Sequence, residues 1–387
     1  MKIAVLGVGT VGIMSICHAL RWLCPTGGTV TSIYDPSIPI FGIGETTQPG
    51  FLQFLYEGTN FTLLNDGDKL DATVKLGGTW HGWRDTVLNA PLTPPGSAMH
   101  FNNHKLKEFC FEQFEKIWDK KFNVIEGSVE ALTNIGSSAQ VSINQQLYDF
   151  DFVIDCRGTP VDWSNYTKFD NLTVNRCLLN IINEPGKWNT TINQAHQHGW
   201  MFGIPLKSRQ GWGYLFNDNI TSKDEAILDI QQIYNTTNLE LKEFSFNSYY
   251  ANEFFDGRIL KNGNRALFFE PLEGTAGYFY ETALRTMYDY INGYCSVEQF
   301  NNNLTTAAVD LKNFVCYVYQ GGSNFKGNFW DETSIKCKDI LSNDIRWVST
   351  VSSIKNQILI NDYSSSVGRW SIPHWKMWDT FFNYSTF

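Results

Sequence analysis

Residues 2–12 read KIAVLGVGTVG, an apolar run that ends in a glycine-rich loop. Residues 3–6 are apolar and partly β-branched, which predicts a buried strand, and residues 11–23 carry apolar groups at helical spacing. Gly7, Gly9 and Gly12 between them fit the GxGxxG loop of dinucleotide-binding folds. Such glycines permit a tight turn, let the backbone approach a pyrophosphate and let the helix pack on the strand. The start of the chain therefore predicts a Rossmann-like fold.

Two further strands continue this pattern. Residues 29–34 read as a second strand, and Asp35 follows at the distance where such folds place an acid that binds a ribose. Residues 152–155, FVID, read as another buried strand that leads toward Gly158. We expect this strand to lie beside the first one, with Asp155 and Gly158 among the cofactor-binding residues.

The remaining pattern predicts an antiparallel sheet inserted into the nucleotide-binding fold. Apolar and polar residues alternate, as in antiparallel strands, in the stretches 69–83, 139–150 and 200–217. Two helices are expected, at 222–234 and 276–293. The fold class is thus α/β, with a helical or irregular, aromatic-rich C-terminal part. We divide the chain into a cofactor-binding region (1–160), an antiparallel-sheet substrate region (161–254), a return to the cofactor-binding region (255–295) and a C-terminal substrate cap (296–387).

Composition narrows the classes of function. Of the 387 residues 43% are hydrophobic and 18% charged, which is typical of a globular protein. A net charge of −9 and the lack of a Lys/Arg-rich run argue against nucleic acid as a partner. The eight cysteines show neither a CxxC pair nor zinc-ligand spacing. We therefore expect no metal, and reduced thiols in a cytoplasmic protein.

The apolar start admits a second interpretation, a secretory signal peptide that begins at Lys2. Glycines would weaken its apolar helix, and His18 and Arg21 follow where a small-residue cleavage site belongs. We favour the strand and glycine turn. No other segment reaches the roughly 18 uncharged apolar residues of a membrane span, so no membrane partner is expected.

A second glycine-rich turn, FGIGETTQPG at 41–50, bears on the choice between NAD and FAD. A loop soon after the second strand suits the longer reach of a flavin dinucleotide. The alternative is an ordinary turn with a helix cap at Thr46 or Thr47, and the segment alone does not decide. The residues expected to contact the cofactor here are Gly42, Gly44, Glu45 and Thr47.

Six segments occur in the order seen in one enzyme family: GVGTVG, GIGETTQP, KLGGTWHGW, DFVIDCRG, GWMFGIPLKSRQGWGY and EPLEGTAGY (270–278). In them the chain resembles flavin-dependent halogenases of the tryptophan-halogenase type, as a short and divergent member. The resemblance spans residue 3 to about residue 280. It implies FAD as cofactor, delivered as FADH2 by a separate flavin reductase, together with O2, a halide ion and a small aromatic substrate.

The resemblance also implies a lysine-dependent mechanism. In this family reduced FAD, O2 and halide give hypohalous acid, which travels through a tunnel to a lysine and is then used on an aromatic carbon. Lys75 stands at that lysine's position, on a strand where Val74, Leu76 and Trp80 should partly desolvate it and lower its pKa. Taken alone, the residue reads as a surface lysine on an alternating strand, which is the usual role of such a lysine.

Other residues follow from the same resemblance. Glu273 matches a glutamate that assists the lysine, and otherwise reads as a first-turn helix acid. Thr275 and Ala276 match the halide site, where Gly274 replaces the usual Ser; a relaxed site of this kind would favour the heavier halides. The expected tunnel residues are Trp200, Phe202 (Trp in the family pattern), Ile204 and Pro205; alone they read as a half-buried strand.

Two other functions stay open. A flavin-dependent monooxygenase or oxidoreductase of the same fold would act without halide and without Lys75. A flavin-binding protein without turnover would bind FAD and form no halogenated product. No second GxGxxG loop appears that could bind NADPH, which favours a separate reductase. The sequence leaves the oligomeric state open.

Overall fold

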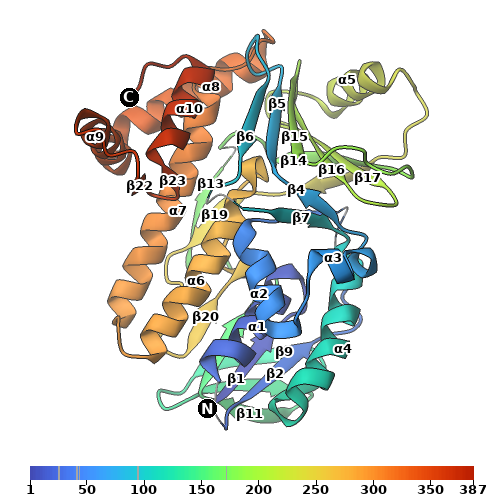
Figure 1. The fold of residues 1–387 in the computed structure, drawn as a ribbon, viewed down its shortest axis with the longest axis vertical. Helices are drawn as coiled ribbons and strands as arrows, with labels where there is room; N and C mark the ends of the chain where they lie inside the picture. Colours follow the sequence, from blue (N-terminus) through green and yellow to red (C-terminus); the bar gives the residue numbers. More distant parts are fainter. Residues whose placement is uncertain (25–26, 41, 43, 94–95, 171) are drawn as a thin grey trace.

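The computed structural model of the protein describes residues 1–24, 27–40, 42, 44–93, 96–170 and 172–387. A five-stranded parallel sheet, in the order β20-β12-β1-β2-β8, forms the lower part of the view in Figure 1. Its strands are β1 (Lys2–Leu6), β2 (Thr29–Tyr34), β8 (Phe122–Glu126), β12 (Phe152–Asp155) and β20 (Ile259–Lys261). β12 pairs with β1, from Ile3 opposite Phe152 to Leu6 opposite Asp155, which confirms the expected neighbour of the first strand.

Helices and a small sheet cover the two faces of this parallel sheet. The helices near it are α1 (Thr10–His18), α2 (Pro49–Thr59), α3 (Leu63–Asp66) and α4 (Leu106–Trp118). The predicted first helix is present, but it ends in a π-helical turn at Ala19–Leu23. The small antiparallel sheet consists of β9 (Val129–Asn134), β10 (Ala139–Ile143) and β11 (Gln146–Phe150). Its Val141 and Ile143 pack in one cluster with Ala4 and Ile33.

A seven-stranded sheet stands above the parallel one, in the order β18-β14-β17-β16-β15-β5-β6. Its strands are β5 (Gly77–His81), β6 (Leu88–Pro91), β14 (Arg176–Ile182), β15 (Thr191–His196), β16 (Gly199–Pro205), β17 (Gln210–Phe216) and β18 (Lys242–Ser245). All its pairings are antiparallel except that of β5 with β15. Helix α5 (Lys223–Tyr234) starts at Ser222 with a capping box, close to the predicted helix.

Two three-stranded sheets connect these layers. One consists of β3 (Glu45–Thr46), β7 (Ala98–Phe101) and β4 (Thr73–Lys75), and the other of β13 (Tyr166–Phe169), β19 (Ser248–Ala251) and β21 (Leu267–Phe268). The first places β4 directly before β5 of the seven-stranded sheet. The alternating stretch 69–83 thus forms two short strands that belong to different sheets.

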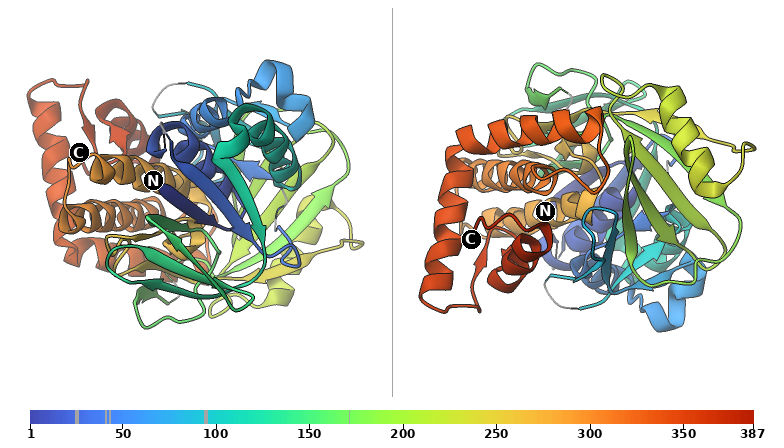
Figure 2. Two further views of the ribbon diagram at one scale, coloured as in Figure 1. Left: turned by 90° about the horizontal axis from the view of Figure 1, so that it is seen from below. Right: turned by 90° about the horizontal axis from the view of Figure 1, so that it is seen from above.

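The C-terminal part is mostly helical. Its elements are α6 (Thr275–Ile291), α7 (Val297–Tyr319), α8 (Asn328–Asn343), α9 (Ile345–Leu359), the hairpin β22 (Ser366–Val367) and β23 (Trp370–Ser371), and α10 (Ile372–Phe382). These helices lie along one side of the molecule in Figure 2. Aromatic rings join them to the seven-stranded sheet: Trp80 lies 5.0 Å from Trp378, and Trp83 lies 5.2 Å from Trp330, between ring centroids.

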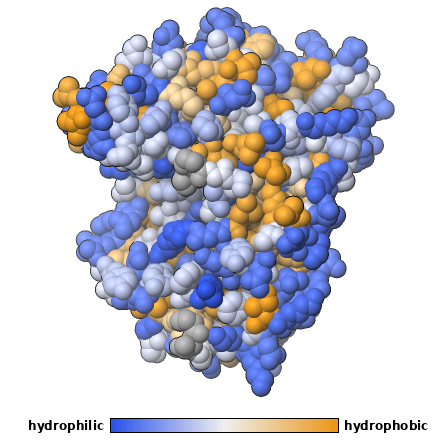
Figure 3. Space-filling view, in the orientation of Figure 1, coloured by the Kyte–Doolittle hydropathy of each residue, from blue (hydrophilic) through white to orange (hydrophobic). Residues whose placement is uncertain are grey.

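The surface in Figure 3 is mostly hydrophilic, with apolar side chains gathered around the narrower middle of the molecule. None of the helices in the described part of the chain combines the length and the apolar character that a membrane span requires.

Candidate active site

Lys75 lies on β4 and points into the molecule. β4 pairs with β7 so that Lys75 stands opposite Ala98, and successive side chains of a strand alternate between its faces. Val74 and Leu76 are therefore exposed, whereas Lys75 is only 4% exposed. This corrects one expectation: Val74 and Leu76 do not desolvate the lysine, because they point to solvent. It also rules out the alternative of a surface lysine.

The environment of Lys75 changes its acidity. Burial lowers the pKa of its ammonium to about 8, although the carboxylate of Glu273 raises it. The Nζ atom donates a hydrogen bond to the carbonyl oxygen of Thr47 at 3.0 Å. A fixed ammonium whose pKa lies near neutrality can hold or release a proton under physiological conditions.

Glu273 lies in the turn that precedes α6, in the left-handed region at φ 58°. Such a conformation costs a non-glycine residue of order 1 kcal/mol and persists where the surroundings determine it. Gln48 supplies one such constraint, because its Nε2 atom donates to the Glu273 carbonyl at 3.1 Å. A Cβ atom added to Gly78 would lie 3.3 Å from Glu273 Oε1. Glycine at that position of β5 thus leaves room for the carboxylate.

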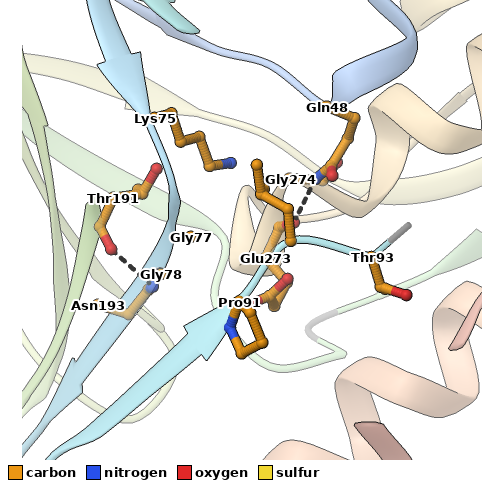
Figure 4. A pocket seen from close by; sticks show the side chains of 11 residues that line it. Gln48, Lys75, Gly77, Gly78, Pro91, Thr93, Thr191, Asn193, Glu273 and Gly274 are labelled. Carbon is orange, nitrogen blue, oxygen red and sulfur yellow. Dashed lines mark hydrogen bonds between the residues drawn. The ribbon is translucent and has the colours of Figure 1, made fainter. Parts of the chain in front are cut away.

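Lys75 and Glu273 line the same small pocket (Figure 4). In that view the Lys75 ammonium points across the pocket toward the turn that holds Glu273 and Gly274. Within the described residues these two groups line the pocket together but form no direct ion pair. The other lining residues are Gln48, Gly77, Gly78, Pro91, Leu92, Thr93, Thr191, Asn193 and Gly274.

The electrostatics of the pocket depend on a third charged residue. Burial raises the pKa of the Glu273 carboxyl, and the cations of Arg369 and then Lys75 lower it again. The indole N–H of Trp80 acts in the same direction, although it forms no hydrogen bond with a described residue. His100, on β7, is kept neutral because burial, and then Lys75, lower its pKa well below the usual value.

The predicted halide residues lie next to Glu273, at the N-terminus of α6. Gly274 is the N-cap at φ 59°, and no side-chain hydrogen bond caps the helix. Thr275 is fully buried and Ala276 half-buried. A helix N-terminus carries about half a positive charge and unpaired N–H groups, so this end of α6 favours an anion. The binding of halide by these residues remains a prediction.

The glycine loop between β1 and α1 fits a dinucleotide pyrophosphate. Gly7 has φ 95°, and a Cβ atom there would lie 2.8 Å from the Cys156 carbonyl oxygen. A Cβ atom at Gly12 would lie 2.1 Å from the Gly7 carbonyl oxygen. At Gly9 it would meet nothing within 4 Å, and no side chain caps α1. The approach to this helix N-terminus is therefore open, as phosphate binding requires.

Three other predicted cofactor residues follow strands of the same sheet. Asp35 follows β2, and its Oδ1 atom accepts two hydrogen bonds, at 2.9 and 2.6 Å, from the residue two positions later. Asp155 ends β12 and binds Arg157 through both carboxylate oxygens, with Arg265 also 3.3 Å away. Gly158 has φ 82° and open space around its Cα. The structure gives Asp155 a role in holding two arginines, and its contact with a cofactor stays a prediction.

Contacts within the protein account for several residues of the second glycine-rich turn. A Cβ atom at Gly42 would lie 1.8 Å from the Asn103 side chain, and Gly44 has φ 128°. Glu45 accepts a hydrogen bond from Asn103 at 3.0 Å, and burial raises its pKa to about 7. The Thr47 hydroxyl is bonded to the backbone of β7, so this turn is tied to the strand beside the lysine. Their cofactor contacts also stay predictions.

The four predicted tunnel residues lie on β16 and are buried. Trp200, Phe202 and Ile204 share one face of the strand, and the Trp200 ring lies 6.3 Å from that of Trp83. The carbonyl of Pro205 accepts a hydrogen bond from Thr73 at 2.7 Å. None of the four is among the described residues that line the pocket of Lys75. They stand in the core beside it, and a tunnel along them is a prediction.

Sequence reasoning missed several residues around Lys75 and Glu273. Gln48 belongs to the segment GIGETTQP, which carries the family resemblance, so the sequence did offer a signal for this residue. Thr191 and Asn193 lie on β15 and carry no recognisable motif. Arg369 lies on the hairpin turn between β22 and β23, in a part of the sequence without clear periodicity. Only the folded chain brings these residues to the site.

The chain is similar to proteins of known function along most of its length. A family model described as tryptophan halogenase matches residues 88–365. Tryptophan 7-halogenase RebH from Lentzea aerocolonigenes is 22% identical over 421 residues, which cover 85% of this chain and 78% of that protein.

Solved structures share the fold. MibH, a lanthipeptide tryptophan 5-halogenase, superposes with a TM-score of 0.81 at 15% identity, covering 99% of this chain and 86% of that one. A tryptophan halogenase from Shewanella frigidimarina NCIMB 400 superposes with a TM-score of 0.79 at 15% identity, covering 99% of this chain and 88% of that one. Since the family match extends over more than half of the sequence, the chain belongs to the tryptophan halogenase family and is an FAD-dependent halogenase.

Proposed function

We propose that the protein installs a halogen on an electron-rich aromatic substrate, with hypohalous acid as the halogen donor and Lys75 as the residue that activates it. One observation carries the proposal: a buried lysine with a lowered pKa shares a pocket with a half-buried glutamate. A lysine that only stabilised the fold would gain nothing from this costly burial. A transfer residue needs it, because burial brings the pKa of the ammonium close to neutrality.

The FAD would be held by the Gly7–Gly12 loop and by Asp35, and it would arrive reduced from a separate reductase. When bound, reduced FAD supplies the chemistry that turns O2 and halide into hypohalous acid. The open N-terminus of α6, with Thr275 and Ala276, is the proposed halide site. The residues of β16 are proposed to line the path between the flavin and Lys75.

The transfer step uses the two charged side chains of the pocket. The Lys75 ammonium donates a proton to the oxygen of hypohalous acid while the halogen bonds to the aromatic carbon, so that water leaves. The carboxylate of Glu273 stabilises the positive ring and accepts the proton that the carbon loses. Returning that proton to Lys75 restores the site, and the balance is hypohalous acid plus arene giving haloarene plus water. Below its pKa of about 8, Lys75 is in the protonated form this step requires.

Turnover of the holoenzyme tests the proposal. The protein is supplied with FAD, a flavin reductase, NADH, O2 and a panel of indoles, phenols and anilines, each with chloride, bromide or iodide. We expect a mass gain equal to one halogen for hydrogen. Hydroxylated product with every halide would indicate a monooxygenase, and hydrogen peroxide alone would indicate flavin binding without transfer.

A variant tests the role of Lys75. Lys75→Met should lower product formation by about 10²- to 10⁴-fold, the usual contribution of a general acid, while FADH2 oxidation and hypohalous acid formation continue. Lys355→Met removes an exposed lysine of α9 and serves as the matched control, with unchanged product. Halogenation that persists in Lys75→Met would show that another residue transfers the halogen.

A further inference from the structure

Gln48 lines the Lys75 pocket and connects its two charged side chains. Its Nε2 atom donates to the carbonyl oxygens of Glu273, at 3.1 Å, and Gly274, at 3.5 Å. Figure 4 shows the Gln48 side chain reaching toward the turn that holds both residues. The carbonyl of the preceding residue, Thr47, accepts a hydrogen bond from the Lys75 Nζ atom at 3.0 Å. Two consecutive residues therefore contact both sides of the site.

The backbone from which Gln48 projects is tied to the strand of the lysine. Thr47 binds the backbone of Met99 on β7 through hydrogen bonds of 3.1, 2.9 and 3.0 Å. β7 pairs in turn with β4, which carries Lys75. Gln48 itself is the N-cap of α2, and its carbonyl accepts a hydrogen bond from Phe51 at 3.1 Å. The amide of Gln48 thus reaches the glutamate turn from a fixed base.

The turn that Gln48 holds decides where the Glu273 carboxylate lies. Glu273 and Gly274 both have a left-handed backbone, at φ 58° and 59°. A non-glycine residue keeps this conformation only where its surroundings determine it. In the described part of the chain no ion pair holds the Glu273 carboxylate, so the course of its backbone sets its position. The hydrogen bonds of Gln48 are therefore a constraint on that position.

Stability does not account for an amide at position 48. Gln48 is 5% exposed, and its Oε1 atom is buried and meets no donor among the described residues. The two carbonyls fix the orientation of the amide, because Oε1 in the place of Nε2 would face them with a third acceptor. A buried acceptor without a donor destabilises the fold, whereas an apolar side chain of the same shape avoids that cost. The use of the amide therefore lies in the turn that its Nε2 atom holds.

We propose that Gln48 is a positioning residue of the halogen-transfer step, because it holds the turn that places the Glu273 carboxylate beside Lys75. This inference rests on the proposed function, in which Glu273 accepts the proton of the ring while Lys75 acts on hypohalous acid. Such a step depends on geometry, since a displacement of about 1 Å costs on the order of 10²-fold in rate. Gln48 acts through Glu273 and need not touch the substrate.

The acidity of Lys75 tests the inference without turnover. The carboxylate of Glu273 raises the pKa of Lys75, so a turn that is no longer held should let that pKa fall. FAD-loaded protein labelled with [¹³Cε]lysine is titrated by NMR, and the Lys75 signal is assigned by its absence in Lys75→Met. We expect a lower pKa of Lys75 in Gln48→Met than in the wild type. An unchanged pKa in folded Gln48→Met would overturn the inference.

Two further variants guard this measurement. Gln53→Met removes an exposed amide of α2 that binds only the neighbouring Glu57 side chain, and as the matched control it should leave the pKa of Lys75 unchanged. If Gln48→Met does not fold, Gln48→Asn decides. Its amide ends one carbon short of the turn, so the pKa of Lys75 must fall there as well, and a wild-type value would overturn the inference.

The same titration in a Glu273→Gln background shows whether Gln48 acts through Glu273. Without the carboxylate, adding Gln48→Met should leave the pKa of Lys75 where Glu273→Gln alone puts it, because the two changes remove one interaction. A further fall of the same size as in the wild-type background would overturn the role, since Gln48 would then act on Lys75 by another route.

Turnover separates this inference from the proposed function. In Gln48→Met we expect about 10- to 100-fold less haloarene for each hypohalous acid formed, with the acid measured by a β-diketone trap. A wild-type ratio would overturn the role of Gln48 and leave the proposed function intact. A lowered pKa of Lys75 in Gln48→Met, with no haloarene from the wild type, would support the hold of Gln48 on the turn and refute halogen transfer at this pocket.

Discussion

Glu270 opens the EPLE segment that ends at Glu273, but it points into the core and away from the pocket. It is 1% exposed and accepts hydrogen bonds from the hydroxyls of Tyr319, at 2.7 Å, and Thr173. Burial raises its pKa to about 7, well above the usual value of a glutamate. Two glutamates three positions apart in sequence thus have different surroundings, and the sequence alone does not tell them apart.

The raised pKa of Glu270 predicts a pH-dependent stability. As pH rises above about 4.5 the carboxyl ionises first in the unfolded chain, so the native state loses stability until pH passes about 7. Glu270→Gln cannot ionise, and it can still accept the Tyr319 hydrogen bond. We expect this variant to be more stable than the wild type by about 1–3 kcal/mol at pH 8.5, with little difference near pH 4.5.

Urea denaturation of both proteins at the two pH values measures this difference. Glu332→Gln, at an exposed position of α8, is the control and should follow the wild type. If the free energies of unfolding of Glu270→Gln and wild type differed by the same amount at pH 4.5 and pH 8.5, Glu270 would not have a raised pKa in the folded protein.

At the scale of elements, the turn before α6 combines two backbone constraints. Glu273 and Gly274 are both left-handed, and a Cβ atom at Gly274 would lie 3.2 Å from the Nε2 atom of Gln48. That same atom holds the Glu273 carbonyl. Glycine at position 274 therefore lets Gln48 approach the turn.

Two alanine variants separate backbone strain from crowding. Gly293, in the turn after α6, has φ 78° and nothing within 4 Å of its added Cβ, so Gly293→Ala carries the left-handed cost alone, about 1 kcal/mol. Gly274→Ala carries that cost and also crowds Gln48. We expect Gly274→Ala to lower the free energy of unfolding more than Gly293→Ala does, as measured by urea denaturation. Equal losses would mean that Gln48 moves aside freely.

The elements with strong local signals were predictable from the sequence. The strands at 3–6, 29–34 and 152–155 are short apolar runs, and α5 begins at a serine with a capping glutamate, so each was confirmed. Helix α7 had no readable period, because its second half, from Leu311 to Tyr319, is buried on every side. A helix segment that is buried on every side does not reveal its period, and the C-terminal part could only be predicted as helical or irregular.

At the scale of the whole molecule, the site depends on pairings between distant segments. The parallel pairing of β5 with β15 brings Asn193 beside the strand that follows Lys75, and no local pattern predicts it. The closeness of Lys75 and Glu273 came only from the family resemblance. The sequence did not identify Arg369 as a residue near the site, because only the fold brings its charge close to Lys75 and Glu273. The four regions into which we divided the chain remain a prediction.

One apolar core links the parallel sheet, the seven-stranded sheet and the C-terminal helices. Ile3, Trp80 and Trp378 belong to the same cluster of buried residues. We therefore expect a single unfolding transition in urea, with coincident midpoints for far-UV circular dichroism and tryptophan fluorescence. Since the tryptophans concentrate around the upper sheet and the C-terminal helices, an independent lower half would separate the two midpoints. Such a separation would contradict the single core.

Lys75, Glu273 and Arg369, whose charges shift one another's pKa, leave the ribosome in a fixed order. Synthesis runs from the N-terminus, and early regions begin to fold first, so Lys75 emerges long before Glu273 and Arg369. Until those residues arrive, the lysine has the acidity of any solvated amine. Under the proposed function, a nascent chain that still lacks Glu273 and the final hairpin would therefore not transfer a halogen.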